Sequence, residues 1–128
     1  MDSGKIKIAV AVVIVLAIGA FIFVQANSHN TKIDVTSNST LMNGDYLTLV
    51  LKDEFRNVYP GEVINVKILD DSGWASYYNG TTDETGTVRI LLEGMENGNY
   101  TVHSTFNGTM FLHQSKSVTN LEMNDGMN

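Results

Sequence analysis

The chain has 128 residues, a length that leaves room for one domain and a short appendage, and 43% of the residues are hydrophobic. It contains no cysteine, so disulfide bridges and thiol chemistry are excluded. The net charge is −6, and the part after residue 26 keeps 13 acidic against 6 basic residues, a surface charge that disfavours nucleic acid and anionic lipid as partners.

The first predicted element is an apolar run of seventeen residues, Ile8–Val24, without a charged or strongly polar side chain. As a helix this run would span about 25 Å, near the lower limit for crossing a bilayer. Lys5 and Lys7 precede it, and no Lys or Arg follows before Lys32. The positive-inside rule therefore places the N-terminus in the cytoplasm.

The run predicts a cytoplasmic N-terminus (1–7), a transmembrane anchor helix (8–25) and a linker (26–30) that leads to an extracellular part. A cleaved secretory signal is the alternative, because Val24 and Ala26 have the spacing that a signal peptidase accepts. The run is longer than the usual signal core of about 7–15 residues, which favours the anchor. A buried core helix is disfavoured, because the run shows no polar stripe.

Seven runs typical of β-strands follow, separated by clusters of Gly, Asn and Asp. They cover residues 32–36, 46–52, 63–69, 74–78, 87–93, 100–106 and 115–123. In the last run Val118 and Leu121 break strict alternation, so a bulge is expected there. The pattern predicts an all-β, two-layer antiparallel sandwich over residues 31–123 and a disordered tail, 124–128. The centre of its core should consist of Leu49, Ile64, Val66, Ile68, Ile90, Val102 and Phe106.

Five short motifs occur in order along this part of the chain. They are Asp53-Glu54-Phe55-Arg56-Asn57-Val58-Tyr59-Pro60-Gly61, Asp70-Asp71-Ser72-Gly73, Thr81-Thr82-Asp83-Glu84-Thr85-Gly86-Thr87-Val88, Gly98-Asn99-Tyr100-Thr101-Val102 and Phe106-Asn107-Gly108. With these motifs, residues 31–122 resemble the bacterial-type Ig-like domains of prokaryotic surface proteins, especially the adhesin-like proteins of methanogenic archaea. The resemblance implies an Ig-like sandwich of about seven strands that acts at the cell surface. That family is usually tandem, whereas this chain has one copy, and Asn97 stands where a Pro is common.

Tyr100 enters its strand directly after a turn. At that position its ring can be buried while its hydroxyl returns to the backbone, as in the tyrosine corner of Ig-like folds.

Four aromatic residues near predicted loops are the strongest candidates for a partner surface: Tyr59, Trp74, Tyr77 and Tyr78. Aromatic rings give a large contact area at low entropy cost, which protein- and glycan-binding surfaces use. The alternative is that Trp74 or Tyr77 packs in the core, as a buried Trp does in antibody domains.

Other candidate chemistry has a structural explanation. Asp70, Asp71 and Asp83 could offer oxygen ligands to Ca²⁺, but Asp in such turns usually bonds its own backbone. His103 and His113 could bind a metal or act in catalysis, yet no third ligand or nucleophile motif accompanies them. We therefore expect neither an enzyme nor a cofactor.

Four sequons of the form Asn-x-Ser/Thr lie in the predicted extracellular part, at Asn38, Asn79, Asn99 and Asn107. They are consistent with a surface glycoprotein.

Together these features predict a single-pass, membrane-anchored extracellular Ig-like domain for adhesion or envelope interaction, with a surface protein or glycan as partner. The alternative is a pilin- or archaellin-like filament subunit, which also joins a hydrophobic N-terminal helix to a β-sandwich. The segment Asp2-Ser3-Gly4-Lys5 lacks the basic residue usual before the processing site of such subunits, which disfavours that alternative. A passive spacer in a larger envelope complex is a third interpretation.

Overall fold

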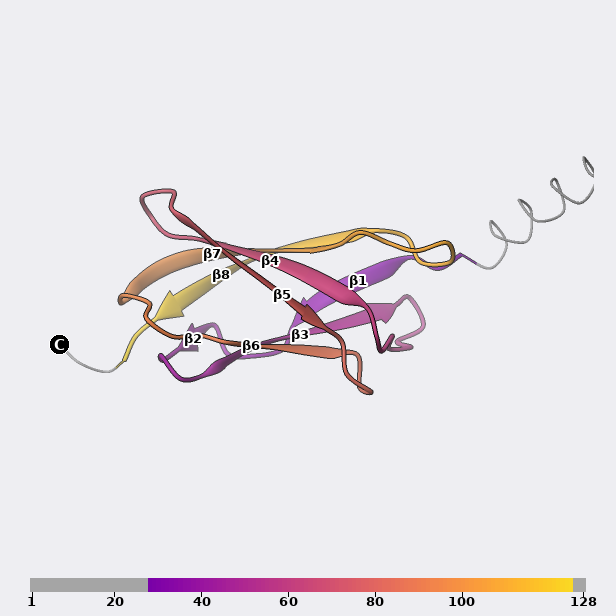
Figure 1. The fold of residues 1–128 in the computed structure, drawn as a ribbon, viewed down its shortest axis with the longest axis horizontal. Coiled ribbons are helices and arrows are strands. Elements are labelled where there is room, and N and C mark those ends of the chain that lie inside the picture. Colours follow the sequence, from indigo (N-terminus) through magenta and orange to yellow (C-terminus); the bar gives the residue numbers. More distant parts are fainter. Residues whose placement is uncertain (1–27, 126–128) are drawn as a thin grey trace, which may run out of the picture.

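The computed structural model describes residues 28–125, and the predicted N-terminus and anchor (1–7 and 8–25) lie outside this range. The described part is all-β and contains no helix (Figure 1). Accordingly, no helix within residues 28–125 is long and apolar enough to span a bilayer.

Eight strands form two sheets. They are β1 (Thr31–Val35), β2 (Thr40–Leu41), β3 (Tyr46–Asp53), β4 (Val63–Leu69), β5 (Ala75–Thr81), β6 (Thr87–Leu91), β7 (Gly98–Phe106) and β8 (Ser115–Met123). One sheet has the order β1-β3-β6, and the other has the order β2-β8-β7-β4-β5. All neighbours pair antiparallel except β2 and β8, which are parallel.

The core lies between the two sheets and follows from period-2 alternation. In β4, for example, Ile64, Val66 and Ile68 are buried, while Asn65 and Lys67 between them are exposed. Successive side chains of a strand point to opposite faces, so one face of each sheet collects the apolar residues. All seven residues predicted for the centre of the core are buried, which confirms that prediction.

Three details of the strands differ from the sequence prediction. The two-residue strand β2 was not predicted, because a pair of residues carries no periodic signal. β5 continues through Gly80 to Thr81, where a turn was expected. The predicted bulge in β8 is wrong, because β7 and β8 pair in one unbroken register from Gly98↔Met123 to Phe106↔Ser115.

The strand directions define two ends of the sandwich (Figure 1). Residue 28 lies at one end, and the β3–β4, β5–β6 and β7–β8 connections return to it. We call it the tether end, because the predicted anchor precedes residue 28 in the sequence. The β4–β5 turn, the β6–β7 connection and the end of β8 lie at the opposite, distal end. A feature of the distal end is therefore separated from residue 28 by the length of the strands.

The last described residues are held at the distal end. Asn124 donates its backbone N–H to the carbonyl of Leu41 at 3.0 Å, and Asp125 accepts hydrogen bonds from the backbone and side chain of Asn43 at 2.8 and 3.0 Å. Asn124 and Asp125 were predicted to belong to the disordered tail, but these bonds attach them to the β2–β3 connection.

Candidate binding surface

The four aromatic candidates occupy two different environments. Trp74 and Tyr77 have 77% and 75% of their surface exposed, so they do not pack in the core. Tyr78 and Tyr59 are half-buried and pack against the core. In β5, Tyr78 pairs with the buried Val66 and so faces inward, whereas Tyr77 faces outward. The structure thus separates two exposed rings from two packed ones.

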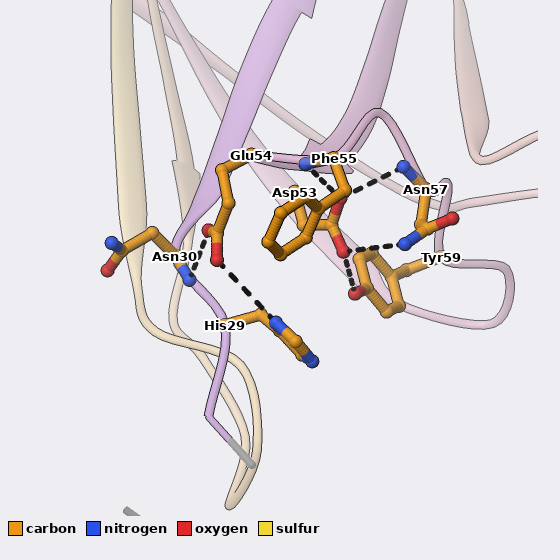
Figure 2. A network of polar contacts seen from close by, with 7 residues as sticks. All are labelled: His29, Asn30, Asp53, Glu54, Phe55, Asn57 and Tyr59. Carbon is orange, nitrogen blue, oxygen red and sulfur yellow. Dashed lines mark hydrogen bonds and ion pairs between the residues drawn. The ribbon is translucent and has the colours of Figure 1, made fainter. Parts of the chain in front are cut away.

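Tyr59 belongs to a polar network that organises the β3–β4 loop (Figure 2). Asp53, at the end of β3, is 4% exposed, and its Oδ2 accepts a hydrogen bond from the Tyr59 hydroxyl at 2.6 Å. Its Oδ1 accepts from the backbone N–H groups of Phe55 and Asn57 at 2.8 and 2.9 Å. The Asn57 side chain donates to Oδ2 at 3.1 Å.

These bonds determine the protonation state of the network. Burial works to raise the pKa of Asp53, but the hydrogen bonds from Tyr59 and Asn57, with that from Phe55, outweigh it and lower the pKa to about 2. Burial, then the hydrogen bond to Asp53, raises the pKa of Tyr59 to about 12. Asp53 is therefore charged and Tyr59 neutral at ordinary pH, and Tyr59 has a structural role.

Tyr77 lies on the outward face of the five-stranded sheet, here called the outer face. Across four strands, Tyr77 of β5 pairs with Lys67 of β4, which pairs with His103 of β7, which pairs with Val118 of β8. Val118 is largely exposed, and Lys67 is exposed as well. Side chains opposite each other on one face lie about 4.5–5.5 Å apart at Cβ, so the four form one continuous row.

A second row runs parallel to the first and is polar. Asn79 pairs with Asn65, Asn65 with Thr105, and Thr105 with Lys116. Between the two rows lies a shallow hollow of about 540 Å³, lined in part by Tyr77, Asn79 and His103. The outer face thus combines an aromatic ring, amides and hydroxyls around a depression.

The charge of this surface differs from that of the whole chain. No residue lining the hollow is acidic, although acids outnumber bases in the sequence. Within residues 28–125, ion pairs engage Lys32, Lys52 and Arg89, whereas Lys67 and Lys116 on the outer face make none. The outer face therefore offers cations to an incoming acidic or hydroxyl-rich group.

In the acidic turns, the side chains of Asp70 and Asp83 accept hydrogen bonds from residues of their own turn. Asp70 Oδ1 accepts hydrogen bonds from the Ser72 hydroxyl and the Trp74 backbone at 2.8 and 2.9 Å, and Asp83 Oδ1 accepts from the Thr85 hydroxyl at 2.6 Å. The hydroxyl bond is the leading cause that lowers the pKa of each carboxyl. Across the described part of the chain, no three acidic or His side chains gather as a metal site would require.

The two histidines considered as metal ligands, His103 and His113, lie apart. His103 is in the middle of β7 on the outer face, whereas His113 is in the β7–β8 connection at the tether end. The sequence pointed to His103 but did not connect it with Lys67, Tyr77 and Val118, because only the pairing register shows which residues share a row.

All four sequon asparagines, Asn38, Asn79, Asn99 and Asn107, are exposed. Asn79 borders the hollow of the outer face, so a glycan there would cover part of that surface. The other three lie outside this hollow.

No family model matches the chain, and no curated protein matches it closely enough to count as a relative.

Proposed function

We propose that the chain is a membrane-anchored extracellular Ig-like domain that binds an envelope or cell-surface partner without catalysis. The strand order supports the Ig-like assignment: β1-β3-β6 corresponds to strands A, B and E, and β8-β7-β4 to strands G, F and C. The Tyr100 hydroxyl donates to the carbonyl of Glu96 at 2.7 Å, which is the bond that a tyrosine corner makes. The apolar run at residues 8–24 supports the anchor.

One observation carries the binding function: Trp74 in the β4–β5 turn and Tyr77 in β5 are both largely exposed. Large exposed aromatic rings expose apolar area to water, and they commonly mark binding surfaces. Trp74 is at the distal end, away from residue 28, and Tyr77 is on the outer face. In an anchored domain, both positions would be accessible to a partner in the surrounding medium.

The membrane topology is tested by adding protease to intact cells that express the full chain. We expect cleavage of the β-domain without lysis. Protection in intact cells together with cleavage after lysis would contradict an extracellular domain. Recovery of the protein in purified filaments, beginning at Lys5, would favour the pilin-like alternative instead.

The contact surface is tested by incorporating a photo-crosslinking amino acid at position 77 in living cells. The matched control is position 46, because Tyr46 is also an exposed strand tyrosine but belongs to the three-stranded sheet. We expect a discrete crosslinked adduct from position 77 and none from position 46. Equal labelling from both positions would mean that the outer face is not the binding surface.

A further inference from the structure

Residues 29–31, where the chain enters the sandwich, are clamped between two loops. The His29 backbone donates to the Phe111 carbonyl at 2.8 Å and accepts from the His113 N–H at 2.9 Å, both in the β7–β8 connection. The Thr31 hydroxyl donates to the His113 carbonyl at 2.6 Å. On the other side, Asn30 donates its N–H to Glu54 Oε2 at 3.0 Å.

The clamp continues through the side chains (Figure 2). His29 Nδ1 lies 3.6 Å from Glu54 Oε1, and the His29 ring meets the Phe55 ring edge-on at a centroid distance of 6.2 Å. The β3–β4 and β7–β8 loops are thereby fixed on either side of the entering chain. Both loops lie at the tether end, and both contact residues 29–31.

Both loops expose large apolar side chains next to this entry point. Phe55 is 69% exposed and Met110 is 68% exposed. Arg56, beside Phe55, is exposed at the tip of its loop, where its backbone is left-handed with φ = 67°. We call Phe55, Arg56 and Met110 the proximal rim. The rim joins two apolar side chains to one cation. Neither Phe55 nor Met110 packs against the core.

The length of chain before the clamp limits how far the rim can lie from a bilayer. Three residues separate Val24, the end of the apolar run, from Ser28. Even a fully extended chain covers at most about 14 Å over that interval. The headgroup layer on each side of the hydrocarbon core is itself about 5–8 Å thick. A domain anchored by the apolar run is thus held with its tether end within about 9 Å of the headgroup layer.

From this geometry we infer that the proximal rim inserts into the lipid interface on the outer side of the membrane. This inference rests on the membrane anchor of the proposed function. Phe55 and Met110 would lie among the upper acyl chains, and the Arg56 guanidinium would reach lipid phosphates, as amphipathic side chains do at interfaces. The acidic β5–β6 turn shares this end, but it makes none of the contacts to residues 29–31 that the structure describes. The domain then stands in a fixed orientation, with Trp74 pointing away from the membrane.

The experiment uses spin labels on single cysteines, since the sequence has no cysteine of its own. The full chain is reconstituted in phosphatidylcholine vesicles with a label at Phe55→Cys or Met110→Cys. The matched control is Met42→Cys, an exposed methionine in the distal β2–β3 connection. The accessibility of each label to oxygen, which partitions into lipid, is compared with its accessibility to a water-soluble nickel complex.

We expect an oxygen-to-nickel accessibility ratio several-fold higher at both rim positions than at position 42. Ratios at positions 55 and 110 equal to that at position 42 would overturn the inference. Flotation of the vesicles is measured first. A chain that fails to float with them contradicts the anchor, whereas a chain that floats with water-exposed rim labels contradicts the rim alone.

Discussion

At the scale of single residues, Asp53 shows how one buried carboxylate shapes a loop. Its two oxygens accept four hydrogen bonds from three residues within six positions along the chain. A buried charge is tolerated only when such bonds replace its lost hydration. The loop that carries Phe55 and Arg56 therefore depends on the charged form of Asp53.

The Asp53–Tyr59 network predicts the acid sensitivity of the fold. The pKa of Asp53 falls from 3.8 to about 2 on folding, so its stabilising contribution is complete above about pH 4 and is lost as the pH falls towards 2. Tyr59→Phe should raise the pKa of Asp53 and destabilise the fold at neutral pH. NMR titration of the Asp53 carboxyl and urea unfolding at several pH values measure both effects. An unchanged pKa in the variant would contradict the network.

Ser104 is a site where a substitution should stabilise the fold, because its buried hydroxyl has no hydrogen-bond partner among the described residues. The side chain is 1% exposed, and within residues 28–125 its Oγ makes no hydrogen bond. Ser104→Ala should increase the free energy of unfolding by about 1 kcal/mol, since an unsatisfied polar atom leaves the core. Ser117→Ala, at the cross-strand neighbour, is the control and should be close to neutral. Chemical denaturation measures both, and a loss of stability in Ser104→Ala would reveal an unseen hydrogen bond.

At the scale of elements, β5 of the larger sheet approaches β6 of the smaller sheet closely at Gly80. A Cβ atom added at Gly80 would lie 2.5 Å from Cγ1 of Val88, so only glycine fits there without movement. Glycine inside a strand often marks such a close approach. The same residue explains why a turn was expected at this position, since Asn-Gly pairs usually signal turns.

Gly80→Ala should therefore destabilise the sandwich by about 1–3 kcal/mol through overpacking. Val88→Ala removes the clashing methyl groups and creates a small cavity. In the double variant the two costs should be less than additive, because the added methyl fills the space that Val88 vacates. The free energy of unfolding in urea is measured for the wild type, the two single variants and the double variant. Strict additivity of the two changes would show that the two residues do not interact.

At the scale of the whole molecule, charge and aromatic surface are unevenly distributed. The distal segments 36–45, 70–74, 92–97 and 122–125 contain seven acidic residues and no Lys or Arg. Lys67 and Lys116, which make no ion pair in the described part of the chain, lie on the outer face. The exposed Phe55 and Met110 lie at the tether end. The acidic end would be repelled by an anionic membrane surface, which favours the same orientation as the proposed anchor would.

The only tryptophan of the chain makes this orientation measurable. In vesicles that contain the full chain, Trp74 should be quenched by aqueous acrylamide, which is neutral, and not by brominated lipid, because it is 77% exposed and at the distal end. Unfolding should change its emission little, since the indole is already in water. Strong quenching by brominated lipid would place the distal end at the membrane and refute the proposed orientation.

The sequence alone determined which residues share a face within most strands. Alternation in β3, β4, β6 and β7 identified the buried core, and the turn before Tyr100 predicted the bond of its hydroxyl to the backbone. These features depend on the two-residue period and on local turns, which are encoded within a few positions. The tertiary structure decided the rest. Ala75–Thr81 has no apolar alternation, so only its pairing with β4 turns Tyr77 outward and Tyr78 inward. The row on the outer face and the clamp around residues 29–31 join segments distant in sequence, and such contacts follow from the register between strands, which no local pattern specifies.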